Sequence, residues 1–239
     1  MNAKRIFILP NTVDETRFSV GPPPLYLRAR YGIQPDERVV LTVARLDPSE
    51  RHAPPGRSHQ NTGKHQHGHK GCDRLIQSPS EVQRAVGPVR YLVVRKGSDR
   101  KRLEGIARNE GVLKQVTFAG FVPDAELLDH YRLADAFAMP STGEGFGIVL
   151  EAMACGTPVL AGNCDGSVDA LDQGRLGRLV DPDSIDEISA GLIALLGRDG
   201  PDCWFDRQCL HDAVSKRFGY NAFRNGVKEN ARRVTDDEL

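Results

Sequence analysis

Short apolar segments alternate with helix-forming segments along most of this chain, and this alternation constrains its fold more than any other feature. The expected strands are residues 39–44, 89–94, 116–120, 136–140, 158–162 and 177–180. They are apolar almost throughout, which is typical of parallel strands covered by helices on both faces. The sequence therefore predicts a doubly wound, Rossmann-like α/β fold that binds ligands at the carboxyl ends of its strands.

Three helices are predicted around these strands with start and stop signals of their own. Residues 184–196 carry an apolar stripe, begin with a capping box of Ser184 and Glu187, and end at Gly197. A second helix is expected after Pro123, with Asp124 as its cap, and a third over residues 98–110. Strands and helices thus follow one another in regular alternation.

The 239 residues are expected to form one domain with terminal extensions. Residues 1–14 are interpreted as a linker-like segment and residues 15–200 as the Rossmann-like domain. Within it, residues 51–70 contain almost no apolar side chain and are predicted to be a disordered insertion. Residues 201–239 return to helical spacing and are expected to pack on the domain as C-terminal helices.

Charge and cysteine content indicate the surroundings of the protein. Lys and Arg number 32, as do Asp and Glu, so no overall field favours a nucleic-acid partner. The five cysteines include no C-x-x-C pair, which fits a reducing cytoplasm. No apolar run is long enough for a transmembrane segment or a signal sequence. We expect a cytoplasmic protein, compatible with an acceptor at the inner membrane surface.

The densest motif is P-S-T-G-E-G-F-G-I-V-L-E-A-M-A-C-G-T-P-V, from Pro140 to Val159. A strand should end at Met139 and a helix should begin near Gly147. The free N–H groups and positive dipole end of such a helix favour a phosphate. Glu144 and Glu151 flank the turn, and carboxylates accept hydrogen bonds from sugar or ribose hydroxyls.

This motif resembles the E-x7-E region of GT-B-fold glycosyltransferases of the retaining, family-4 (group 1) kind. Other elements follow in family order: L-T-V-A-R-L-D at 41–47, H-K-G-C-D-R-L-I at 69–76, R-L-E-G-I-A-R-N-E-G-V at 102–112, V-T-F-A-G-F-V-P-D at 116–124, H-Y-R-L-A-D-A-F at 130–137 and G-R-L-V-D-P at 177–182. The resemblance implies the C-terminal half of a GT-B fold, with residues 15–200 as its nucleotide-sugar-binding domain.

The resemblance also implies a role for each matching residue. The catalytic set would be Arg45, Lys70 and Glu144, with both cations on the donor diphosphate and Glu144 on the sugar hydroxyls. Charge stabilisation of the leaving nucleoside diphosphate would be the main catalytic device. The expected donor is a UDP-, GDP- or ADP-linked hexose, transferred with retention and without a metal or other cofactor.

The implied donor-binding residues come from two segments. The start of the helix after the glycine turn would hold the sugar and distal phosphate, a carboxylate further along would hold the ribose, and the turn after the third strand would contact the base. The residues at the helix start are Gly145, Phe146, Gly147 and Ile148. Glu151 would hold the ribose, and Phe121 and Val122 would contact the base.

Three departures from the family pattern bear on this site. Six residues separate Glu144 from Glu151 where the family has seven, and we expect the helix start to absorb the deletion. Arg95-Lys96-Gly97 stands where the family has a G-[DE]-G turn, which changes both backbone freedom and charge. The loop between Arg45 and Lys70 is longer than in the family.

Other interpretations stay open beside glycosyl transfer. The chain could be a non-catalytic nucleotide-sugar-binding module, an inactive fragment, or a related epimerase. Acceptor recognition would come from a separate domain or chain, because only the linker-like segment precedes the donor domain. The tract at residues 65–69, with His52 and His59, could ligate zinc, nickel or copper, but nothing pre-organises it, and no metal site is expected.

Overall fold

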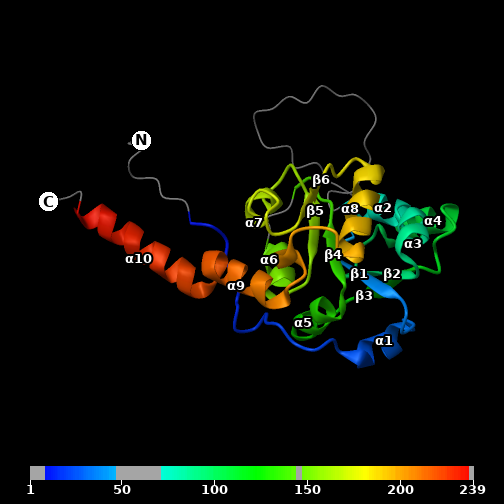
Figure 1. The fold of residues 1–239 in the computed structure, drawn as a ribbon, viewed down its shortest axis with the longest axis horizontal. Coiled ribbons are helices and arrows are strands. Elements are labelled where there is room, and N and C mark those ends of the chain that lie inside the picture. Colours follow the sequence, from blue (N-terminus) through cyan, green and yellow to red (C-terminus); the bar gives the residue numbers. More distant parts are fainter. Residues whose placement is uncertain (1–8, 47–70, 144–146, 237–239) are drawn as a thin grey trace, which may run out of the picture.

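The computed structural model describes residues 9–46, 71–143 and 147–236, the side chains of 234–236 excepted (Figure 1). All six predicted strands are present, within one residue at either end. They are β1 (Arg38–Val43), β2 (Val89–Val94), β3 (Val116–Gly120), β4 (Ala136–Met139), β5 (Val159–Gly162) and β6 (Arg178–Val180). The predicted pattern of apolar segments therefore corresponds to the sheet of the protein.

The six strands form one parallel sheet in the order β3-β2-β1-β4-β5-β6. The chain builds outward from β1 to β3, then returns to the other side of β1 and builds outward again through β4. Such a reversal leaves a crevice at the carboxyl ends of the two central strands, where doubly wound folds bind their ligands. This confirms the predicted doubly wound topology and places the ligand edge beside β1 and β4.

Helices cover both faces of the sheet because successive strand side chains point to opposite faces. Leu41 and Val43 of β1 join one apolar cluster, and Val40 joins the other. The first cluster is covered by α1 (Leu25–Tyr31), α5 (Asp124–Leu133), α6 (Gly147–Ala154), α7 (Ser167–Ala170) and α9 (Arg207–Phe218). The second is covered by α2 (Cys72–Gln77), α3 (Pro79–Val86), α4 (Arg100–Asn109) and α8 (Ile185–Gly197) (Figure 1).

The helix ends match the sequence signals only in part. The hydroxyl of Ser184 accepts a hydrogen bond from the Glu187 amide at 3.1 Å, as the capping box predicts. The Glu187 carboxylate accepts from the amide of Asp181 instead of Ser184, so half of the box is formed. Asp124 is the first residue of α5 and does not cap it, which corrects that prediction. Its carboxylate is used elsewhere, in an ion pair described below.

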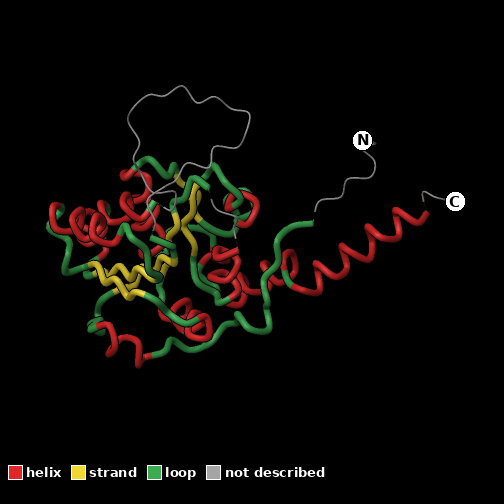
Figure 2. The backbone as a smooth tube through the Cα atoms, turned by 180° about the vertical axis from the view of Figure 1, so that it is seen from behind, coloured by secondary structure: helices red, strands yellow, loops and turns green. Residues whose placement is uncertain are grey.

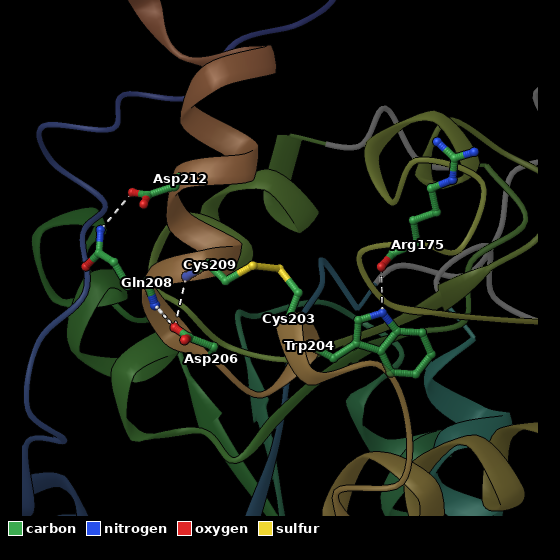
Figure 3. Close-up of a disulfide and its surroundings, with 7 residues drawn as sticks. All are labelled: Arg175, Cys203, Trp204, Asp206, Gln208, Cys209 and Asp212. Carbon is green, nitrogen blue, oxygen red and sulfur yellow. Dashed lines mark hydrogen bonds between the residues drawn. A yellow bond between two sulfur atoms is a disulfide. The ribbon is translucent and has the colours of Figure 1, made fainter.

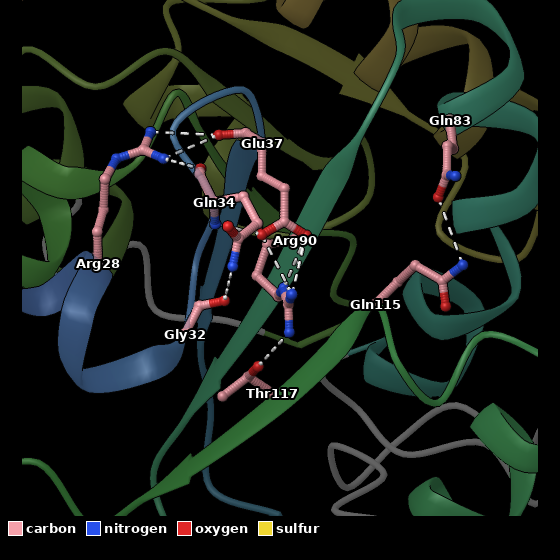
Figure 4. Close-up of polar contacts among 8 residues, drawn as sticks. All are labelled: Arg28, Gly32, Gln34, Glu37, Gln83, Arg90, Gln115 and Thr117. Atoms are coloured by element: carbon pink, nitrogen blue, oxygen red, sulfur yellow. Dashed lines mark hydrogen bonds and ion pairs between the residues drawn. The ribbon is translucent and has the colours of Figure 1, made fainter.

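A polar network joins the amino ends of the three strands on one side of the sheet (Figure 4). The Glu37 carboxylate accepts hydrogen bonds from Arg90 at 2.9 Å, and Arg90 Nη1 donates to the Thr117 hydroxyl at 3.4 Å. Arg28 of α1 donates to the carbonyl of Glu37 at 3.2 Å. These contacts stabilise the sheet at the edge opposite the ligand crevice and leave that crevice to other residues.

The C-terminal tail forms two helices, of which only the first covers the sheet. Helix α9 packs on α6, whereas α10 (Tyr220–Asp236) packs on α9 and projects away from the body (Figures 1 and 2). The N-terminal segment runs beside the junction, where the Thr12 hydroxyl donates to the carbonyl of Phe218 at 2.7 Å. The tail thus departs from the expectation that both helices pack on the domain. None of the helices in the described part of the chain has the length and apolarity needed to cross a bilayer.

A disulfide between Cys203 and Cys209 joins the 3-10 turn η2 (Asp202–Trp204) to α9 (Figure 3). Their Cα atoms are 5.4 Å apart, within the range that a disulfide spans. The Asp206 carboxylate caps α9 by accepting from the amides of Gln208 and Cys209, and this tight turn brings the cysteines together. This disulfide was not predicted, because a C-x5-C spacing in the sequence gives no sign of the turn.

Candidate functional site

The candidate site lies at the carboxyl ends of β1 and β4, where the strand order reverses. Arg45 follows β1 by two residues and is exposed at this edge. Helix α6 begins at Gly147, as predicted, on the segment that follows β4. Since β1 and β4 are hydrogen-bonded neighbours, the structure brings the strand end that carries Arg45 and the start of α6 to the same crevice.

Several predicted site residues lie outside the described residues. These are Lys70, Glu144, Gly145 and Phe146, together with the histidine-rich tract at 65–69. The shortened spacing between Glu144 and Glu151 includes residues 144–146, which lie outside the described residues. How the start of α6 absorbs the missing residue is therefore not tested.

Gly71, the first described residue after Lys70, shows why the K-G element contains a glycine. It has φ 64° and precedes α2, and a Cβ there would lie 1.9 Å from the carbonyl oxygen of Pro140. Such an approach is open only to glycine. The chain directly after Lys70 is thereby held against the end of β4, at the crevice.

Among the predicted donor-binding residues, Glu151 has the best-defined surroundings in the structure. It lies half-buried on α6, and its Oε2 accepts a hydrogen bond from the hydroxyl of Tyr131 at 2.8 Å. Burial raises the pKa of Glu151, against the opposing effects of the Tyr131 hydrogen bond and of Arg17 and Arg95. A carboxylate has about four lone-pair positions, so one bond from Tyr131 leaves capacity for the two hydroxyls of a ribose.

Tyr131 holds Glu151 from the core side. Its ring is fully buried and meets Phe18 and Phe137 edge-on, at centroid distances of 5.9 and 5.8 Å. Burial, then the charge of Glu151, raises the pKa of Tyr131, so the phenol stays protonated and donates. Nothing in the sequence indicates this bond to Glu151.

The two residues expected at the base differ in how they face solvent. The Phe121 side chain is 61% exposed, and Lys96 Nζ lies 5.8 Å from its ring centroid. Val122 is 2% exposed and packs in the core, so only its backbone can meet a ligand. Gly147 and Ile148 are half-buried, and Ile148 packs against the same cluster.

The Arg95-Lys96-Gly97 turn keeps a glycine-like backbone despite its altered sequence. Arg95 has φ 97°, in the region that favours glycine, and its amide donates to the carbonyl of Gly120 at 2.7 Å. A Cβ on Gly97 would lie 1.9 Å from the carbonyl oxygen of Leu46, so that glycine is needed for close packing. The arginine and lysine of this turn therefore bring new side chains to the crevice, while the backbone keeps the conformation that a glycine turn would have.

Two charged residues join this site without having been predicted there. Asp124 forms an ion pair with Arg95 at 3.5 Å, and Arg17 Nη2 donates to the carbonyl of Asp124 at 2.5 Å. Together with Arg95, these two residues come from three segments that only the tertiary fold brings together. Nothing in the spacing of these residues along the sequence could have grouped them.

Within the described residues, no three His, Cys, Asp or Glu side chains come together as metal ligands would. The described residues at this edge include the arginines Arg17, Arg45 and Arg95, and guanidinium groups are suited to bind phosphate oxygens directly.

The fold is a Rossmann-type domain whose strand order reverses between β1 and β4, the point at which such domains bind their ligands. The family model for glycosyl transferases group 1 matches residues 65–203, more than half of the chain. The chain therefore belongs to this family, and its fold is that of the C-terminal domain of a GT-B glycosyltransferase.

Two curated relatives illustrate the similarity in sequence. The chain is 34% identical over 197 residues to a GDP-mannose-dependent alpha-(1-6)-phosphatidylinositol monomannoside mannosyltransferase of Mycolicibacterium smegmatis, covering 79% of this chain and 46% of that protein. It is 35% identical over 198 residues to a D-inositol 3-phosphate glycosyltransferase of Segniliparus rotundus, covering 81% and 39%. The chain thus spans less than half the length of these relatives.

Solved structures show the same fold at lower sequence identity. A sucrose-phosphate synthase from Thermosynechococcus elongatus superposes with a TM-score of 0.72 at 23% identity, over 97% of this chain and 53% of that one. The C-terminal domain of a glycosyl transferase group 1 family protein from Francisella tularensis superposes with a TM-score of 0.64 at 20% identity, over 87% and 99%. The chain thus covers about half of the longer structure and nearly all of the single C-terminal domain.

Proposed function

We propose that this chain is the donor-binding half of a family-4 glycosyltransferase that transfers a hexosyl group from a nucleoside diphosphate sugar with retention of configuration. The proposal is supported by the positions of these residues along the sheet: Arg45 follows β1, α6 with Glu151 follows β4, and the two strands are hydrogen-bonded neighbours. A cation and free helix amides suit a diphosphate, and the half-buried carboxylate of Glu151 further along α6 suits a ribose.

Catalysis in this proposal depends on charge stabilisation of the leaving group. Arg45 and Lys70 would neutralise the diphosphate as the bond to the sugar breaks, and Glu144 would hold the sugar hydroxyls. A cation about 4 Å from an anion is worth about 4 kcal/mol at an effective dielectric near 20. No metal or other cofactor is needed for such a step, because the side chains supply the positive charge.

The acceptor would be bound by a separate domain or chain. Support comes from the curated relatives, of which this chain matches less than half, and from the apolar side chains that α10 exposes. Tyr220, Phe223 and Val227 of α10, with Thr12 of the N-terminal segment, line a groove of about 570 Å³. This groove is a surface on which an acceptor-binding half could dock.

Calorimetric titration of the full chain with GDP, UDP, ADP and GDP-mannose tests the donor site. GDP-mannose is included because the mannosyltransferase relative carries it in its name. We expect at least one diphosphate to bind, and we expect Arg45→Ala to weaken it about tenfold or more through the lost charge-assisted contact. Arg108→Ala, an exposed arginine on α4, is the matched control and should bind as the wild type does.

A second measurement separates an enzyme from a binding module, the alternative that the short E-x6-E spacing favours. Slow hydrolysis of the bound sugar nucleotide, abolished in Arg45→Ala, would support catalysis by this domain. Binding without hydrolysis would support a non-catalytic module, and silence towards every diphosphate would overturn the proposal.

A further inference from the structure

The hydroxyl of Tyr131 contacts Glu151 from the core side, and the function proposed above gives this contact no part. Tyr131 lies on α5 and Glu151 on α6, and the phenol donates to Glu151 Oε2 at 2.8 Å. Tyr131 is fully buried, whereas Glu151 is half-buried. A ligand can therefore reach Glu151 but not Tyr131, so any effect of Tyr131 on binding passes through the carboxylate.

Contacts from three segments fix the position of Tyr131. Its ring meets Phe18 of the N-terminal segment and Phe137 of β4 edge-on, at centroid distances of 5.9 and 5.8 Å. The buried hydroxyl of Thr157, in the turn after α6, donates to the carbonyl of Tyr131 at 2.7 Å. Close packing leaves such a ring little freedom. The phenol oxygen is therefore a fixed point against which the less buried carboxylate is oriented.

The phenol acts on Glu151 as a hydrogen-bond donor. Burial, then the charge of Glu151, raises the pKa of Tyr131, so the hydroxyl keeps its proton. A buried hydroxyl needs an acceptor, and a carboxylate that accepts a hydrogen bond is stabilised in its ionised form. The bond engages Oε2 and leaves Oε1 and further lone pairs of the carboxylate as acceptors for a ligand.

We propose that Tyr131 is a positioning residue, which holds the Glu151 carboxylate ionised and oriented to accept hydrogen bonds from the ribose hydroxyls of the donor; this inference rests on the proposed function. Without the phenol, the half-buried carboxylate loses a partner and is free to turn or to take up a proton. The loss should therefore affect the ribose hydroxyls specifically and should depend on pH.

Other groups at the crevice also act on the charge of Glu151. Burial, the main influence, raises its pKa, and the Tyr131 hydrogen bond is the first of the influences that lower it. The other charged or titratable groups near the carboxylate are Arg17 of the N-terminal segment, Arg95 after β2, Asp124 of α5 and Cys155 after α6. All four remain in Tyr131→Phe, so the loss of the phenol should raise the pKa of Glu151 further.

Tyr131→Phe and Tyr91→Phe form a matched pair of variants. Each removes one buried hydroxyl and keeps the ring. Tyr91 lies on β2 in the cluster on the other face of the sheet, and its hydroxyl is 3.2 Å from that of Ser78. Calorimetry of the full chain uses the tightest-binding of GDP, UDP and ADP. We expect Tyr131→Phe to bind it about tenfold more weakly and Tyr91→Phe to stay within twofold of the wild type.

The 2′-deoxy form of the same nucleotide tests whether the effect reaches the ribose. The wild type and Tyr91→Phe should bind it about tenfold more weakly than the ribonucleotide, whereas Tyr131→Phe should distinguish the two by less than threefold. In Tyr131→Phe the affinity should also begin to fall at a higher pH than in the wild type. A loss of stability alone would change neither the ratio nor the pH profile.

A measurement on the wild type does not depend on the folding of a variant. The chain has five tyrosines, so carbon-13 at the tyrosine Cζ gives few resonances. We expect the Tyr131 resonance to shift when the nucleotide is added, because the carboxylate that it contacts gains new partners. The Tyr91 resonance should stay in place.

The outcomes separate this inference from the proposed function. An unchanged ribose preference in Tyr131→Phe, or a Tyr131 resonance that does not respond to the nucleotide, overturns the positioning role and leaves the donor site standing. A wild type that binds the two forms equally removes Glu151 from the ribose and Tyr131 with it. Failure of every nucleoside diphosphate to bind overturns both this inference and the proposed function.

Discussion

Glu151 combines burial with a role that requires its ionised form, so donor binding should depend on pH. Its pKa is raised, chiefly by burial. As the pH falls through that raised pKa, Glu151 takes up a proton and loses acceptor capacity for the ribose. The affinity for a nucleoside diphosphate should therefore begin to fall at a higher pH than it would if Glu151 had the pKa of an exposed glutamate.

Comparison of the wild type with Glu151→Gln isolates this effect from titration of the ligand phosphate, which both proteins share. At pH 7.5 the variant should bind about tenfold or more weakly, the value of a hydrogen bond to a charged group. The ratio of the two affinities should shrink as the pH falls. Glu81→Gln, an exposed glutamate on α3, is the control. A ratio that stays constant with pH would remove Glu151 from the ribose site.

His130 gives a second pH prediction, for stability. It is fully buried and bonded to the Tyr31 hydroxyl at 2.8 Å and the Glu126 carbonyl at 2.7 Å, and burial lowers its pKa. A histidine of the unfolded chain has a pKa of about 6.5, so below that pH the unfolded state binds a proton that the native state does not. The free energy of unfolding should therefore decrease with acidification from about pH 7, by at most about 1.4 kcal/mol per pH unit.

Urea unfolding at pH 7.5 and 5.5 measures this dependence. His130→Gln should be less stable at pH 7.5, because it loses native packing, but should lose less stability between the two pH values. Equal losses in wild type and variant would show that His130 is charged in the native state.

At the scale of elements, the turns at the crevice are held by close backbone contact. A Cβ on Gly97 would lie 1.9 Å from the Leu46 carbonyl oxygen, whereas a Cβ on Gly105 in α4 would meet no heavy atom within 4 Å. We expect Gly97→Ala to destabilise the fold by about 1–3 kcal/mol through overpacking. Gly105→Ala should stabilise it by about 0.5–1 kcal/mol, since alanine favours the helix. Chemical denaturation measures the free energy of unfolding of both variants. Equal changes in the two would contradict the close packing at Gly97.

The disulfide joins η2 to α9, the helix that packs on α6. Without reductant, the denatured protein should show three reactive thiols out of five, from Cys72, Cys155 and Cys164. Because the bridge closes a short loop, reduction should lower the free energy of unfolding by only about 2 kcal/mol. Five reactive thiols in the untreated protein would contradict the pairing.

At the scale of the whole molecule, the fold could be predicted from sequence more fully than the site. Apolar periodicity reports which faces are buried, so the strands and α8 were predicted closely. The ion pair of Arg95 and Asp124 and the bond of Tyr131 to Glu151 depend on contacts between distant segments, which periodicity does not encode. The tail shows the same limit, since α10 has helical spacing but projects from the body.

Hydrogen exchange of the full chain with and without GDP tests whether a nucleoside diphosphate binds where β1 and β4 end. We expect added protection of amides at residues 44–46, 120–122 and 147–151, and none over α10. Protection confined to α10 or to the amino ends of the strands, or no protection at saturating GDP, UDP and ADP, would contradict it.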